Sequence, residues 1–205
     1  MGDMKKLVGL CVGLMMIITG SIAVATNAEA GETETKVIKS EASGTFVSTN
    51  FDFDHLDLST PANQLEAEGK GNIIGRFTAH GVNEFAPDLK VKNCTVPGGV
   101  AEAGTPFTLV EDVDATRITA TGDFLFFKST SGTACQDFST SPTPPFPFSF
   151  TETGVVTGGT GKFSGATGTY TGDGQGATLF VDATGGRVFG WFKNSFVTTV
   201  TVKEK

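Results

Sequence analysis

Histidine, tyrosine, tryptophan and cysteine are all scarce in this 205-residue chain, which contains two, one, one and three of them. With only His55 and His80, few side chains can act as acid–base catalysts near neutral pH. No Cys-x-x-Cys spacing indicates a zinc or redox site, and no Gly-x-Ser-x-Gly turn indicates a serine hydrolase. The sequence therefore identifies no catalytic residue, no metal site and no cofactor.

Basic residues are also few, with 15 Lys and Arg against 22 Asp and Glu and a net charge of −7. An acidic chain is a poor partner for nucleic acid or anionic lipid, so no nucleic-acid partner is expected. What the chain has in excess is phenylalanine, with 18 copies against a single Tyr170 and a single Trp191. This bias favours an apolar interior over the exposed aromatic platform of a sugar-binding protein.

The first 30 residues have the three-part pattern of a secretory signal peptide. Lys5 and Lys6 precede an uncharged stretch from 7 to 25, and Ala28-Glu29-Ala30 supplies a small-x-small cleavage site after Ala30. An uncleaved anchor is the alternative, because the uncharged stretch approaches the roughly 18–20 residues that a spanning helix needs. We expect cleavage, a secreted or extracytoplasmic protein, and no stable membrane insertion afterwards.

About 175 residues follow the leader, enough for one domain with a substantial core. Residues 31–43 are charged and polar, which predicts a loose N-terminal tail before a domain over 44–205. Cys94 and Cys135 are the two cysteines left, and an even count in an oxidising compartment predicts one disulfide. Two buried free thiols are the alternative.

Apolar residues alternate with a period of two and are punctuated by glycine, which predicts an all-β domain. Strands are expected at 73–81, 107–110, 116–120, 124–127, 146–156 and 187–202, with a turn at Asp112–Asp114, a loop at 139–147 and one short helix at 54–65. A generous count gives about eight strands. That number suits an antiparallel lipocalin-like barrel, and a two-sheet β-sandwich is the alternative.

Within 73–81, Phe77 and Ala79 fall on the face predicted to point inward, and Arg76 and His80 fall on the other face. The simplest interpretation is that Arg76 and His80 are exposed. If the two faces are inverted, Arg76 and His80 line the cavity and could steer an anionic ligand.

Twelve glycines lie from Gly154 to Gly190, and those at 158–161 predict a tight hairpin. A phosphate-binding loop is not favoured, because β-rich sequence follows instead of a helix. The string Gly158-Gly159-Thr160-Gly161-Lys162-Phe163 with Gly165-Ala166-Thr167-Gly168 is similar to the hairpin motif of the allene oxide cyclase barrel-like superfamily. Dirigent proteins of plants and uncharacterised bacterial secreted proteins belong to it.

This resemblance implies an eight-stranded antiparallel barrel over about residues 44–203. For activity, it implies a cofactor-independent isomerase or cyclase. For assembly, it implies a trimer like that of dirigent proteins, and the sequence itself leaves the oligomeric state open. Three functions are compatible with the sequence: binding of a small hydrophobic ligand, cyclisation or isomerisation of a reactive substrate, and a surface or matrix interaction. A wide cavity with converging polar groups would favour the enzyme, and a packed interior would favour a structural role.

Overall fold

The computed structural model describes residues 32–48, 62–99, 101–139, 143–182 and 187–203. The predicted signal peptide and its cleavage site after Ala30 lie outside these residues. No helix among the described residues is both long and apolar enough to cross a membrane.

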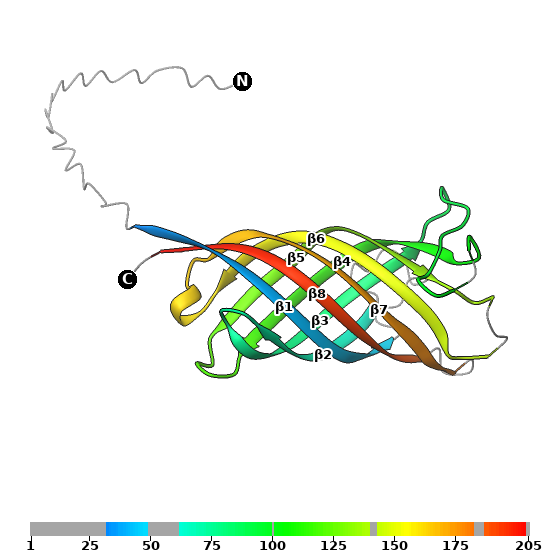
Figure 1. Cartoon of the computed structure of the whole chain (residues 1–205), viewed down its shortest axis with the longest axis horizontal. Coiled ribbons are helices and arrows are strands. Elements are labelled where there is room, and N and C mark those ends of the chain that lie inside the picture. Colours follow the sequence, from blue (N-terminus) through cyan, green and yellow to red (C-terminus); the bar gives the residue numbers. More distant parts are fainter. Residues whose placement is uncertain (1–31, 49–61, 100, 140–142, 183–186, 204–205) are drawn as a thin grey trace, which may run out of the picture. The chain divides into compact units, whose positions relative to one another are not determined.

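Eight long antiparallel strands make up most of the described chain (Figure 1). They are β1 (Thr33–Ser48), β2 (Ala62–Gly71), β3 (Gly75–Pro87), β4 (Thr105–Ile118), β5 (Phe124–Gln136), β6 (Phe146–Gly159), β7 (Thr167–Asp182) and β8 (Arg187–Lys203). Each strand pairs with the next, and β1 also pairs with β8 along its whole length, so one sheet closes into a ring. The all-β prediction is confirmed, and the alternative of two separate sheets is wrong.

The predicted loose tail at residues 31–43 is wrong from Thr33 onward, where the chain enters β1. Its polar residues alternate with smaller inward residues, and Ile38 is buried with only 2% of its surface exposed. The backbone of this segment bonds to β8 and, from Ser40, to β2. Polar composition was misleading here because a strand with one solvated face needs few large apolar residues.

The predicted turn at Asp112–Asp114 is also wrong, because β4 runs unbroken through it. Both aspartates sit at inward positions and pair with β3, Asp112 opposite Asn83 and Asp114 opposite Gly81. Aspartate usually marks turns because its side chain competes for backbone hydrogen bonds. Closure of the ring overrides that preference at these two positions.

Other predictions hold in part. The strand at 146–156 and the last strand are confirmed. The loop predicted at 139–147 is confirmed at its described residues up to 145, but Phe146 and Pro147 belong to β6. The helix predicted at 54–65 is wrong for 62–65, which begin β2, and its other residues lie outside the described part. The hairpin at 158–161 is wider than predicted, because a single 3₁₀ turn, η1 (Gly161–Phe163), separates β6 from β7.

One end of the ring is filled by an apolar core, at the end where β1 begins and β8 finishes. Its buried members come from six strands and from the connections β2–β3 and β6–β7: Ile38, Ile74, Phe77, Ile118, Leu125, Val156, Phe163, Ala166, Val200 and Val202. Phe163 of η1 packs here with 2% of its surface exposed. The 3₁₀ turn therefore closes this end of the ring.

Glycine and aromatic residues face each other across neighbouring strands. Six inward aromatic residues lie directly opposite a glycine, in the pairs Gly69–Phe77, Gly154–Tyr170, Gly172–Phe196, Gly174–Phe150, Gly176–Phe148 and Gly190–Phe46. A Cβ at any of these glycines would overlap the opposing ring. Six glycines thus make room for aromatic rings inside this ring of strands.

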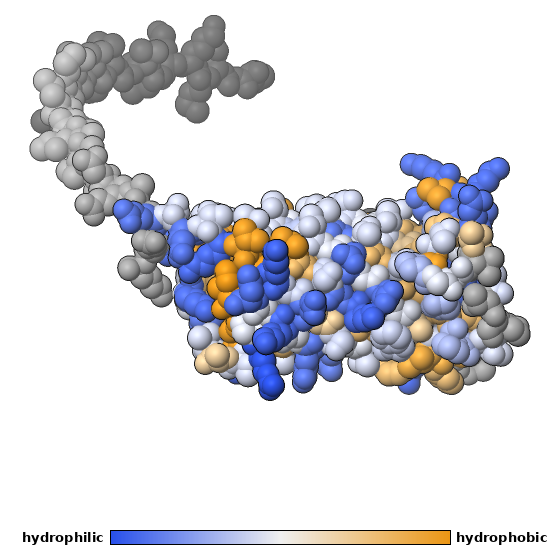
Figure 2. Space-filling view, in the orientation of Figure 1, coloured by the Kyte–Doolittle hydropathy of each residue, from blue (hydrophilic) through white to orange (hydrophobic). Residues whose placement is uncertain are grey.

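The outer surface is largely hydrophilic or neutral, with apolar residues in small patches on the face that Figure 2 displays. Cys94, in the connection between β3 and β4, forms a disulfide with Cys135 of β5, with an S–S distance of 2.06 Å. The predicted disulfide is therefore confirmed. It fastens a long connection to the wall of the ring, at the end opposite the apolar core.

Candidate functional site

An interior cavity of about 410 Å³ lies inside the ring beside the apolar core. Most of its lining is apolar, and aromatic rings predominate toward the end away from the core: Phe46, Phe85, Phe107, Phe148, Phe150 and Phe192. The volume falls in the range of pockets that hold small molecules. A molecule of that class could therefore be enclosed here.

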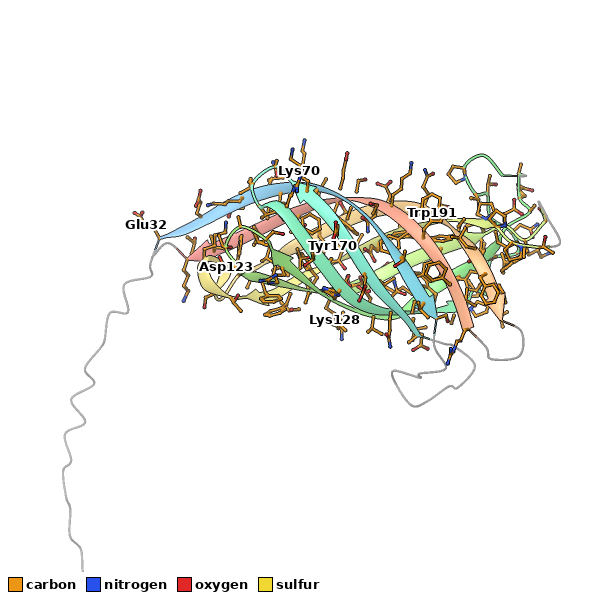
Figure 3. All side chains as sticks on the ribbon, turned by 90° about the horizontal axis from the view of Figure 1, so that it is seen from below. Glu32, Lys70, Asp123, Lys128, Tyr170 and Trp191 are labelled. Atoms are coloured by element: carbon orange, nitrogen blue, oxygen red, sulfur yellow. A yellow bond between two sulfur atoms is a disulfide. The ribbon has the colours of Figure 1, made fainter. Side chains whose placement is uncertain are left out.

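A cluster of polar side chains interrupts this apolar lining midway along the ring. Its members are Asp112 and Asp114 of β4, Ser129 of β5, Glu152 of β6 and Tyr170 of β7, and we refer to them as the acidic cluster. Figure 3 shows Tyr170 within the ring, whereas Lys70 and Lys128 lie on its outside. Four consecutive strands thus direct polar groups to one place because their inward faces meet there.

Ser129 is the centre of the hydrogen bonding in the acidic cluster. Its Oγ lies 2.5 Å from Asp112 Oδ2, 2.5 Å from Tyr170 Oη and 3.3 Å from Glu152 Oε2. Ser129 is buried, with 6% of its surface exposed. One hydroxyl therefore connects two carboxyl groups and a phenol.

The number of protons in this network is limited, because a serine hydroxyl donates only one proton and accepts through two lone pairs. If Ser129 donates to Asp112, it must accept from Tyr170. Its remaining neighbour, Glu152, then faces it most favourably as a protonated carboxyl group. The shorter contact thus favours Asp112 as the acceptor of the Ser129 proton, with Glu152 as a neutral carboxyl group.

Burial also favours the protonated forms of the titratable groups in the acidic cluster. Burial, and then the negative charge of Asp112, raise the pKa of Glu152 to about 8, although the contact with Ser129 opposes this. Burial, and then the charges of Asp112 and Glu152, raise the pKa of Asp114 well above its ordinary value. Burial, followed by the charge of Glu152, also raises the pKa of Tyr170. Glu152 is therefore largely protonated at neutral pH.

Two glycines create the space that the acidic cluster occupies. A Cβ at Gly81 would overlap the carboxyl group of Asp114, and a Cβ at Gly154 would overlap the ring of Tyr170. The Tyr170 ring is also held edge-on by Phe127 and Phe196, with centroid distances of 5.4 and 5.8 Å. The positions of Asp114 and Tyr170 are therefore set by packing as well as by hydrogen bonds.

Several hydrogen-bond acceptors in the cavity have no donor among the described residues. Asp114 receives no hydrogen bond from them, and the buried Oδ1 of Asn194 receives none either. Farther along the cavity, Asn63 donates to Asn83 at 3.0 Å and Gln136 donates to Thr178 at 2.7 Å. Asp114 and Asn194 are thus acceptors that a bound molecule could use.

The lining contains three carboxyl groups and, among the described residues, no lysine, arginine or histidine. Nor do three His, Cys, Asp or Glu side chains in the described part of the chain converge as ligands of a metal ion. The described lining therefore places acidic side chains in the cavity without a basic side chain beside them.

Arg76 and His80 do not belong to this site. They occupy exposed positions on the outer face of β3, where His80 Nδ1 lies 3.8 Å from Glu66 Oε1 of β2. Phe77, Ala79 and Gly81, on the alternate face of β3, line the cavity. The hypothesis that inverted faces let Arg76 and His80 steer a ligand is therefore wrong, and the simpler interpretation of exposed side chains is confirmed.

Sequence reasoning missed the whole acidic cluster, although one signal was present. Asp112 and Asp114 share the period-two face of Thr116 and Ile118, and Glu152 shares that of Phe148 and Phe150. Carboxyl groups in phase with a strand's apolar face indicate buried ionisable groups, which often mark functional sites.

Comparisons with known proteins give no further information. No protein-family model, no curated protein and no solved structure matches this chain.

Proposed function

We propose that this chain is a secreted, lipocalin-like barrel protein that binds a small, largely apolar molecule in its interior. The observation that carries the proposal is the cavity of about 410 Å³ with its mainly aromatic and aliphatic lining. A closed eight-stranded sheet is about the size at which the interior can enclose one small ligand. A purely structural role is less well supported, because it predicts a packed interior.

Two sequence features agree with this proposal. The pattern over residues 1–30 is typical of a signal peptide, and the Cys94–Cys135 disulfide is compatible with an oxidising compartment. The motif at 158–168 resembles that of the allene oxide cyclase barrel-like superfamily, whose members have a barrel of this strand number.

Binding can be tested with N-phenyl-1-naphthylamine, an uncharged apolar dye that fluoresces when it leaves water. The dye should bind saturably at about one molecule per chain. Leu65→Trp should abolish binding because Leu65 lines the cavity, whereas Gln64→Trp, on the exposed face of the same strand, should leave it unchanged. Equal binding by both variants would place the dye outside the cavity and contradict the proposal.

A second candidate is a cofactor-independent isomerase or cyclase that acts on a reactive substrate held in the cavity. The observation that favours it is the pairing of a largely protonated Glu152 with Asp112 through one hydroxyl, since pairs of groups with separated proton affinities serve as acid and base. The test is to let the methyl ester of an unsaturated fatty-acid epoxide, which carries no carboxylate, cyclise with and without protein. Catalysis predicts an enantiomeric excess that Glu152→Gln removes, and a racemic product argues against it.

A further inference from the structure

The charge balance of the cavity restricts the chemistry of its ligand. Asp112, Asp114 and Glu152 line it, and the rest of the described lining contributes apolar or neutral polar side chains. An anionic ligand would bring a further negative charge among carboxyl groups in a site of low dielectric, where like charges repel strongly. Fatty acids and other carboxylates are therefore poor ligands for this cavity.

A metal ion is also a poor fit. Hard cations such as Ca²⁺ need six to eight oxygen ligands close together. No three acidic, histidine or cysteine side chains among the described residues are arranged in that way. A cation that suits the cavity must therefore require fewer ligand atoms and must have apolar substituents that contact the aromatic lining.

We infer that the cavity accepts an apolar molecule carrying one protonated amine, whose ammonium group lies at the carboxyl groups of the acidic cluster. This inference rests on the binding function proposed above and names the chemical class of the ligand. An ammonium group donates up to three hydrogen bonds. Asp114 and the Oδ1 of Asn194 accept none from the described residues, so acceptors are available.

The two parts of such a ligand match two parts of the cavity. Phe196, one inward position beyond Asn194, packs edge-on against Tyr170 and adjoins the acidic cluster. Phe148 and Phe150 lie nearer the end away from the core, with ring centroids 6.3 Å apart. The ammonium group would thus meet carboxyl oxygens midway along the ring while the apolar body meets aromatic rings. Aromatic faces also attract cations, which favours an amine further.

Binding of a cation should displace a proton from the site. The titratable groups near Glu152 are Asp112 and Asp114 on β4 and Tyr170 on β7, and Ser129 on β5 is its neutral hydrogen-bonding neighbour. The cavity lining has no other titratable side chain among the described residues. An ammonium group beside Glu152 stabilises its ionised form, so a largely protonated Glu152 releases its proton when the amine binds. Asp114, whose pKa is raised as well, is stabilised in its ionised form in the same way.

The test compares three probes that share one apolar body: 4-phenylbutylamine, 4-phenyl-1-butanol and 4-phenylbutanoate. Calorimetry at pH 7 should give a dissociation constant for the amine at least about tenfold lower than for the alcohol, because charge-assisted hydrogen bonds are the stronger ones. The carboxylate should bind most weakly. Titrations in phosphate and in Tris, which differ in ionisation enthalpy, should show proton release with the amine and none with the alcohol.

A matched pair of variants locates the ammonium group. Asp114→Asn keeps the size of the side chain and loses no hydrogen bond from a described residue. This substitution should weaken amine binding about fivefold or more and should leave alcohol binding unchanged. Asp173→Asn, at an exposed position on β7, should affect neither probe. If Asp114→Asn does not fold, the comparison of probes and the proton release in the unaltered protein still test the inference.

The outcomes separate this inference from the proposed function. If the naphthylamine dye binds but the amine binds no better than the alcohol, the inference is overturned and the binding function stands. If the amine is preferred but Asp114→Asn and Asp173→Asn weaken it equally, the assigned position is overturned. If neither the dye nor any probe binds, the proposed function itself fails.

Discussion

The hydroxyl oxygens of Ser129 and Tyr170 lie 2.5 Å apart inside the ring, joined across β6 from strands β5 and β7. The two residues are 41 positions apart in the sequence. Ser129 is buried between Asp112, Glu152 and Tyr170, so it determines how protons are shared in the acidic cluster. Its removal should therefore affect stability more than the loss of one hydrogen bond.

Ser129→Ala should destabilise the protein by about 1–3 kcal/mol, because buried polar partners lose a hydrogen bond that water does not replace. Urea unfolding monitored by circular dichroism measures this change. Ser131→Ala, at an exposed position on the same strand, should stay within about 0.5 kcal/mol of the parent. Similar effects of both substitutions would show that the cluster contributes little to stability.

The raised pKa of Glu152 predicts that stability falls as pH rises. Its pKa is about 8 in the folded protein and near 4.5 without the fold, so the folded state holds more protons between these values. The free energy of unfolding should therefore decrease from about pH 4.5 to pH 8. Asp114 contributes in the same direction because its pKa is raised too.

Glu152→Gln removes this titration, so the variant should lose less stability than the parent between pH 5 and pH 8.5. Urea unfolding at several pH values provides the comparison. Glu68→Gln, at an exposed position on β2, is the control and should keep the parental slope. A Glu152→Gln slope equal to that of the parent would mean that Glu152 is ionised throughout this range.

Gly81 and Asp114 should be energetically coupled because a Cβ at Gly81 would overlap the Asp114 carboxyl group. Gly81→Ala alone should cost about 1–3 kcal/mol, as expected for overpacking. In an Asp114→Ala background the same substitution should cost less, with a coupling energy of about 0.5–3 kcal/mol. Additive effects in this double-mutant cycle would argue that the two residues do not compete for space.

Reduction of the Cys94–Cys135 disulfide should lower the free energy of unfolding by about 3–4 kcal/mol, since the bridge closes a loop of about 40 residues. Denaturation with and without dithiothreitol measures this difference. The double variant Cys94→Ser with Cys135→Ser should be insensitive to the reductant and should resemble the reduced protein. A parent protein equally stable with and without reductant would contradict the expectation.

Much of the fold could be predicted from local pattern. Phe77 and Ala79 were assigned to the inward face from alternation alone, and the last strand was predicted almost to its bounds, because its side chains alternate over many residues. The first strand was missed because Glu34, Lys36 and Lys39 make its sequence look like a solvated tail. Its stability comes from pairing with β2 and with β8, and the paired residues of β8 are 140 to 170 positions away in the sequence.

The candidate site was not predicted, and Asp112 explains why. Local preference places aspartate in turns, and nothing near it in the sequence indicates the hydroxyl of Ser129, which comes from another strand. Arg76 and His80 were candidate ligand contacts because side chains that titrate near neutral pH are scarce in this chain, yet both are on the outer face. Residue type alone did not indicate which of these side chains face the cavity.

The sequence by itself determined the all-β class, the inward face at Phe77 and Ala79 and the pairing of the only two cysteines beyond the predicted leader, because alternation and cysteine count are local properties of the chain. Only the tertiary structure decided that Asp112, Asp114, Glu152 and Tyr170 share one interior and that glycines make room for its aromatic rings. The physical reason is closure of the sheet. Alternation indicates which side chains of a strand share a face. The register of eight strands around the ring decides which of these side chains meet inside.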